Sequence, residues 1–229
     1  MIVLTKPEKR VLEYLGKHGP SIGNQMSKSP GLSSKTASTA PRSLEKKGLV
    51  SRRNRRTFAR PASEYSLTLK GLAQVLTLGT PERHISFSVK HWKHLLPGIL
   101  DKWSFFRDQG VLGIAQKRLL YAAEWFIRPI DEQARLEYLV QHPLEYTPPT
   151  SYLVVKGTEL GVFVGLFYDL RIMLAYREKW VEACVKDPLL INTIKSQIGN
   201  LIDEAEHDLK EYRAIAQALR KAQRPEPSE

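Results

Sequence analysis

Two short stretches decide the fold: Leu44-Glu-Lys-Lys-Gly-Leu-Val50 and Tyr65-Ser-Leu-Thr-Leu-Lys-Gly71. The first has the features of a helix end, because lysines occupy the last turn and Gly48 supplies the stop. In the second, apolar residues alternate with polar ones, which is the period of a half-buried strand. The basic, proline-containing segment between them is typical of the tip of a hairpin. We therefore expect a helix that leads into two strands, 49–53 and 64–69, and then into a further helix.

Three helices are predicted up to this point. The first covers residues 6–17, with a proline in its first turn and Gly16, Gly19 and Pro20 at its end. Ser21 is expected to cap a short second helix that reaches about residue 29. A serine at position 33 or 34 is expected to cap the third helix, which runs to about residue 47.

The positive charge of the chain is concentrated near the N-terminus. Residues 1–80 hold 15 Lys and Arg against 4 Asp and Glu, whereas residues 81–229 hold 20 of each, so the whole net charge of +11 belongs to the first 80 residues. This asymmetry indicates a polyanion-binding module joined to a neutral region. The alternative is a basic, solvated face that has no specific partner.

The order helix, helix, helix, hairpin, helix over residues 6–78, with the two stretches quoted above, resembles the winged helix-turn-helix domain of prokaryotic transcription regulators such as the MarR-like and PadR-like groups. The resemblance covers about a third of the chain. It implies that the third helix is the recognition helix, that the hairpin is the wing, and that the chain binds double-stranded DNA.

The third helix has side chains that suit the major groove, where base edges present a distinct pattern of donors and acceptors. The candidate contacts are Ser34, Lys35, Thr36, Ser38, Thr39 and Arg42. Pro41 lies inside this helix and cannot donate a backbone hydrogen bond. Either the helix kinks there or a shorter helix begins near Pro41, and Arg42 faces the DNA in both cases.

The hairpin carries a dense set of arginines, which are Arg52, Arg53, Arg55, Arg56 and Arg60. We expect them to lie along the phosphate backbone or to enter the minor groove, whose negative potential attracts arginine. A nuclear-localisation tract would be equally basic, but it would not explain the flanking strands. Binding through these residues should weaken steeply with salt.

The fold class predicted for the chain is mainly α with a small β-hairpin wing. A winged helix-turn-helix domain occupies residues 1–80, a helical domain with a possible but unidentified small-molecule effector pocket follows over 81–222, and residues 223–229 form a disordered tail. The last helix is expected to begin at Asp187-Pro188 and to be long. Its apolar residues have the 4-3 spacing of a coiled-coil seam, and we expect this seam to form a homodimer rather than to pack on its own domain. The seam residues are Ile198, Ile202, Ala205, Leu209, Tyr212, Ala216 and Leu219.

Other classes of function find little support. No nucleophile elbow, phosphate-binding loop or dinucleotide fingerprint is present, so we expect neither an enzyme nor a cofactor. His91 and His94 could form half of a metal site, but no partner follows at a convincing spacing, and no metal is predicted. The single cysteine, Cys184, fits a reducing compartment, and the apolar run 160–170 is too short to cross a membrane. A cytoplasmic, nucleoid-associated protein without a membrane partner is expected.

We favour a sequence-specific transcription regulator that acts as a homodimer. Two alternatives stay open. One is an architectural or chromatin-associated protein that binds DNA with little sequence preference. The other is a winged-helix module that binds protein or RNA.

Overall fold

Local signals set the limits of the first helix, α1 (Lys6–His18). Thr5 is its N-cap, since the Thr5 N–H donates to Glu8 Oε2 at 2.7 Å and the Thr5 hydroxyl accepts from the Glu8 N–H. The helix ends at Gly19, whose φ of 78° disfavours any residue with a Cβ. The helix predicted over residues 6–17 is confirmed.

The segment that follows α1 differs from the prediction. Ser21 does not cap a helix but lies in a two-residue strand, β1 (Ser21–Ile22), and its hydroxyl donates to the Gly19 carbonyl oxygen at 3.1 Å. The helix α2 (Gly23–Met26) is correspondingly shorter than predicted. A strand of two residues has no periodicity from which it could be recognised.

The third helix, α3 (Ser34–Lys46), begins at Ser33, whose side-chain oxygen accepts the Thr36 N–H at 3.1 Å. It runs without interruption through Pro41, which is buried. The alternative of a shorter helix that begins near Pro41 is therefore wrong. The missing proline N–H leaves the Ala37 carbonyl without its usual helical donor.

Strands β2 (Val50–Arg56) and β3 (Pro61–Leu67) form the predicted hairpin, and both extend further toward its tip than expected. The sheet has the antiparallel order β1-β3-β2, with Val50 opposite Leu67 and Arg56 opposite Pro61. The chain is thus mainly helical with a small three-stranded antiparallel sheet.

Helix α4 (Leu69–Leu76) follows the sheet directly, capped by Thr68. Its Gly71 lies so close to the start of the hairpin that a Cβ there would be 1.9 Å from the Leu49 carbonyl oxygen. Only glycine permits this approach of α4 to the backbone before β2.

The next elements are α5 (Pro81–His91), the 3-10 turn η1 (Lys93–Leu95), α6 (Trp103–Asp108) and α7 (Leu112–Ile127). Pro97 and Gly98 interrupt the chain between η1 and α6, and Gly98 has a φ of 82°.

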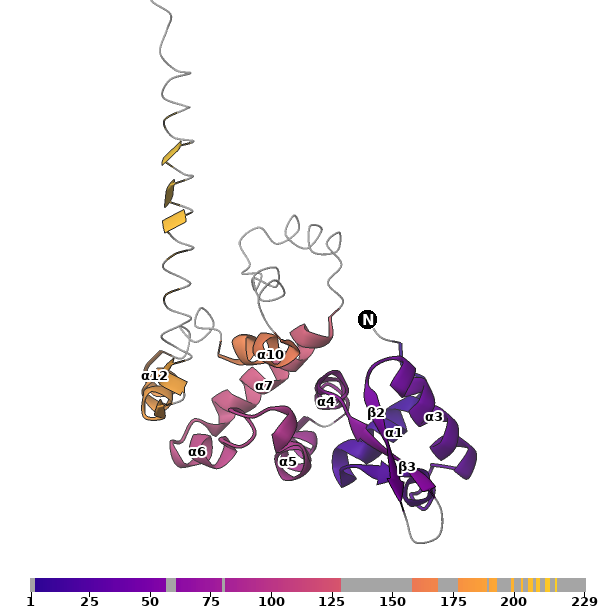
Figure 1. Ribbon diagram of the computed structural model, residues 1–229. Coiled ribbons are helices and arrows are strands. Elements are labelled where there is room, and N and C mark those ends of the chain that lie inside the picture. The colour runs from indigo at the N-terminus through magenta and orange to yellow at the C-terminus, as the bar shows by residue number, and fades with distance from the viewer. Residues whose placement is uncertain are drawn as a thin grey trace, which may run out of the picture. The chain divides into compact units, whose positions relative to one another are not determined.

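Residues on the two sides of the expected boundary at 80/81 share one core. The Trp92 indole N–H donates to the Gly16 carbonyl oxygen at 3.1 Å, and Trp92 is fully buried. Helix α1 packs against α5, and α4 contacts both α1 and α7 (Figure 1). The contacts between residues divide the chain into two compact units, Met1–Tyr168 and Asp169–Glu229.

The structure is a computed structural model that describes residues 3–56, 61–79, 81–128, 158–168, 177–188 and 190–192, with single residues and pairs between 199 and 217. The first unit ends with α10 (Glu159–Phe167), which packs on α7, and the second contains α12 (Arg177–Val185). The tail 223–229 and most of the predicted seam lie outside the described residues. Within the described ranges, no helix combines the length and the apolar character that a bilayer crossing requires.

Candidate nucleic-acid interface

Helix α3 has one buried and one exposed face. Ala37, Ala40 and Leu44 are buried on the inner face. The exposed residues recur at the three- and four-residue spacing that aligns side chains along a helix. We call them the α3 face, and they are Lys35, Ser38, Thr39, Arg42 and Lys46, with Ser34 exposed at the helix start.

Lys46 was not among the predicted contacts, because it belongs to the stretch interpreted as the helix end. Its spacing of four residues from Arg42 could have revealed it. Among the described residues, no carboxylate lies within 4.0 Å of the charged groups of Lys35, Arg42 or Lys46. Three cations on one helix face are therefore available to an anionic partner.

The hydroxyl groups of α3 differ in what they can offer. The Thr36 hydroxyl lies 3.0 Å from the Ser33 hydroxyl, so it completes the helix cap. The Thr39 hydroxyl donates to the Lys35 carbonyl oxygen at 2.9 Å and keeps only acceptor capacity. Ser34 and Ser38 have no hydrogen-bond partner for their hydroxyls among the described residues. Of the predicted polar contacts, Ser34 and Ser38 are thus the best placed to donate to a ligand.

The strand register separates the predicted wing arginines onto two faces. Arg52 lies opposite Tyr65 and Arg53 opposite Glu64, and successive residues of a strand point to opposite faces of the sheet. Arg52 is on the α3 side, where its Nε lies 3.5 Å from Glu45 Oε1. Arg53 and Arg55 share the other face.

The wing arginines also differ in their ion pairs. The Arg55 guanidinium donates to Glu64 Oε1 at 2.8 Å, whereas Arg53 is exposed and has no ion-pair partner among the described residues. Arg56 pairs through its backbone with Pro61, but its side chain and the whole of Arg60 lie outside the described part of the chain. Of the three wing arginines whose side chains the structure describes, Arg53 is therefore the one without a competing carboxylate.

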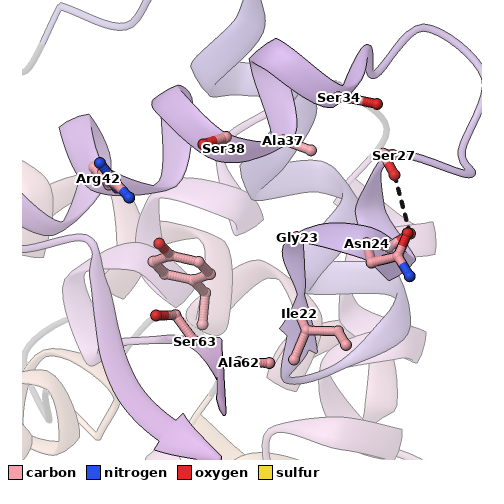
Figure 2. Close-up of a pocket in the computed structure, with 11 residues that line it drawn as sticks. Ile22, Gly23, Asn24, Ser27, Ser34, Ala37, Ser38, Arg42, Ala62 and Ser63 are labelled. Carbon is pink, nitrogen blue, oxygen red and sulfur yellow. Dashed lines mark hydrogen bonds between the residues drawn. The ribbon is translucent and has the colours of Figure 1, made fainter. Parts of the chain in front are cut away.

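A hollow of about 370 Å³ lies between α2, α3 and β3. Figure 2 shows Ser34, Ser38 and Arg42 along α3, Asn24 on α2 with Ser27 just after its end, and Ser63 on β3. Its complete lining is Ile22, Gly23, Asn24, Ser27, Ser34, Ala37, Ser38, Arg42, Ala62, Ser63 and Tyr65. Asn24, Ser27 and Ser63 were missed by the sequence analysis, since only the folded chain brings α2 and β3 beside α3.

A buried carboxylate fixes α3 on α1. Glu8, which is 3% exposed, accepts from the Ser43 hydroxyl at 2.7 Å and forms a 2.7 Å ion pair with Lys47. Burial alone would raise the pKa of Glu8, but the Lys47 ammonium and the hydrogen bonds from Thr5 and Ser43 outweigh it and lower the pKa from 4.5 to about 2. Lys47, the C-cap residue of α3, therefore neutralises Glu8 and holds α3 on α1.

The described residues contain no group of three or more His, Cys, Asp or Glu side chains that could hold a metal ion. Cys184 is buried, and burial raises the pKa of its thiol to about 12, so the thiol stays protonated. No family model matches the chain, and no curated protein or solved structure matches it either.

Proposed function

We propose that residues 6–78 form a winged helix-turn-helix that binds double-stranded DNA, and that the chain is a transcription regulator of the cytoplasmic nucleoid. The carrying observation is the α3 face, where Lys35, Arg42 and Lys46 align without a carboxylate partner among the described residues. An α-helix with this face fits the major groove, where Arg42 can reach guanine or phosphate and Ser38 can contact either. The order of helices and strands up to α4 supports the same assignment.

The hairpin would lie along the DNA backbone as the wing. Arg53 can contact phosphate directly. Arg52 and Arg55 must first break their ion pairs with Glu45 and Glu64, respectively. Exposed ion pairs of this kind are worth only about 0–1 kcal/mol, so exchanging a carboxylate for a phosphate costs little. Each phosphate contact adds about −0.9 to the slope of log K against log salt.

We propose that the chain acts as a homodimer through the seam of its last helix. Leu209 is the seam residue that the structure describes, and it is 48% exposed. Ile198, Ile202, Ala205, Tyr212, Ala216 and Leu219 lie outside the described residues. We expect Leu209→Glu to convert a dimer into a monomer in sedimentation equilibrium, and Gln217→Glu to leave the dimer intact. A dimer that survives Leu209→Glu unchanged would rule out this seam.

The DNA-binding proposal is tested by selecting bound duplexes from a random pool and measuring affinity for the selected and the scrambled sequence over a range of salt. A triple alanine variant of Lys35, Arg42 and Lys46 should lose at least tenfold in affinity and flatten the salt slope. The control removes the same charge from exposed lysines elsewhere in the unit, Lys90, Lys93 and Lys117. Equal losses in both variants would mean that net charge, and not the α3 face, drives binding.

The same measurements decide between the alternatives. Equal affinity for selected and scrambled duplexes would replace the regulator with an architectural DNA-binding protein. Unchanged duplex binding after neutralising both the α3 face and Arg53 would favour a module that binds protein or RNA. No catalytic constellation enters this proposal.

A further inference from the structure

The hollow between α2, α3 and β3 has the chemistry of an anion site. Its lining includes one cation, Arg42, and no carboxylate. Arg42 is exposed and has no ion-pair partner among the described residues, so its guanidinium can turn to a ligand without breaking an ion pair there. A neutral or cationic ligand would leave this charge uncompensated.

The number of donors around the hollow favours phosphate over carboxylate. The hydroxyls of Ser34 and Ser38 have no partner among the described residues, and the Asn24 side chain is exposed beside them. The Ser27 hydroxyl donates to the Asn24 carbonyl oxygen at 3.0 Å and is therefore already engaged (Figure 2). A guanidinium fork uses two oxygens of an anion, so a phosphate keeps at least one further oxygen for the serines. A carboxylate would have to accept from the serines with the same two oxygens that the fork already holds.

The size of the hollow is compatible with more than a bare ion. Its volume of about 370 Å³ lies at the lower end of the range of small-molecule sites. Ile22, Ala37 and Ala62 add apolar surface to the polar lining. A small phosphorylated metabolite has both the charge and the apolar body that such a lining accepts.

We propose that this hollow binds a phosphate group held by Arg42, Ser34 and Ser38, and that a free phosphomonoester competes there with a duplex backbone. The competition rests on the proposed function, because the same three side chains lie at the DNA-facing side of α3 in that proposal. A phosphorylated metabolite would then release DNA by direct displacement at α3, without a pocket in the helical region.

The first experiment measures phosphate binding without DNA. Inorganic phosphate is titrated into the ¹⁵N-labelled full-length chain at constant ionic strength, with chloride as the reference salt. Saturable shifts are expected for the backbone amides of α3 and for the Arg42 Nε–H. Arg42→Ala should weaken binding at least tenfold, and Arg42→Lys should have an intermediate effect because it keeps the charge and loses the fork.

The matched control is Arg83→Ala, which removes an exposed arginine from α5. It should leave phosphate binding unchanged. Shifts that do not saturate, or equal losses in Arg42→Ala and Arg83→Ala, would overturn the assignment of the hollow. Thermal melting of each variant shows whether it is folded. Both variants are expected to fold, because both positions are exposed.

The second experiment adds the duplex and uses ribose 5-phosphate as competitor. Release of the duplex by ribose 5-phosphate, beyond that caused by chloride at equal ionic strength, would support competition at the hollow. Phosphate binding without such release would overturn the competition. If no duplex binds at all while phosphate still binds through Arg42, the DNA-binding proposal fails and the phosphate site stands.

Discussion

Replacing Glu8 with glutamine tests how α3 is held on α1. The lowering of the Glu8 pKa from 4.5 to about 2 corresponds to about 3 kcal/mol of the free energy of unfolding near pH 7. The variant keeps the shape of the side chain but removes the charge that faces Lys47 and Ser43. We expect a loss of about 2–3 kcal/mol, measured by urea unfolding.

The same pKa shift predicts a pH dependence with a definite sign. Because the pKa of Glu8 is lower in the folded chain, the stabilisation is complete above about pH 4.5 and is lost as the pH falls toward 2. The wild type and Glu8→Gln differ in their free energy of unfolding. This difference should be smaller than at pH 7 by about 0.8 kcal/mol at pH 4 and by about 2 kcal/mol at pH 3. The control is Glu124→Gln, which alters an exposed carboxylate on α7. The reasoning is refuted if Glu8→Gln unfolds like Glu124→Gln, or if the gap between wild type and Glu8→Gln does not narrow from pH 7 to pH 3.

Four further substitutions test the packing of the first compact unit, Met1–Tyr168. Gly71→Ala should lower the free energy of unfolding in urea by more than about 2 kcal/mol, since its Cβ would lie 1.9 Å from a backbone oxygen. Gly113→Ala, whose Cβ would lie in open space on α7, should raise it by about 0.5–1 kcal/mol. Trp92→Phe leaves the buried Gly16 carbonyl without its donor and should cost about 2–4 kcal/mol in the same assay. Burial lowers the pKa of the His84 imidazole in the folded chain, so as the pH falls the imidazole is protonated more readily in the unfolded chain than in the folded one. The stability that neutral His84 contributes is therefore lost as the pH falls below about 6.5. His84→Gln should reduce the fall in melting temperature between pH 7.5 and 5.5.

The sequence was most informative where local rules act alone. The serine cap and glycine stop of α3, and the alternation that ends in Leu67, depend on neighbours within a few residues, and they predicted α3 and the hairpin. The prediction was wrong where pairing with distant residues decides the outcome. Ser21 forms a strand because Tyr65 lies opposite it, and no local signal contains that partner.

The candidate site shows the same limit at the level of side chains. Helical spacing placed Lys35, Ser38 and Arg42 on the exposed face of α3 correctly. Composition alone grouped the wing arginines together, although the register separates Arg52 from Arg53. A count of basic residues cannot reveal the ion pairs that occupy some of them, since those depend on carboxylates brought in by folding.

Helix α1 connects the candidate interface to the helices beyond residue 80. Near its N-terminus, Glu8 holds the C-terminal end of α3 through Ser43 and Lys47. Near its C-terminus, the Gly16 carbonyl, one of the helix-end groups that has no intrahelical donor, is satisfied by Trp92. A chain cut after residue 79 would lose that donor and the whole packing of α5 on α1. The orientation of α3 therefore depends on residues well outside the first 80, and a change in the packing of α5 would reach α3 through α1, the helix that contacts both.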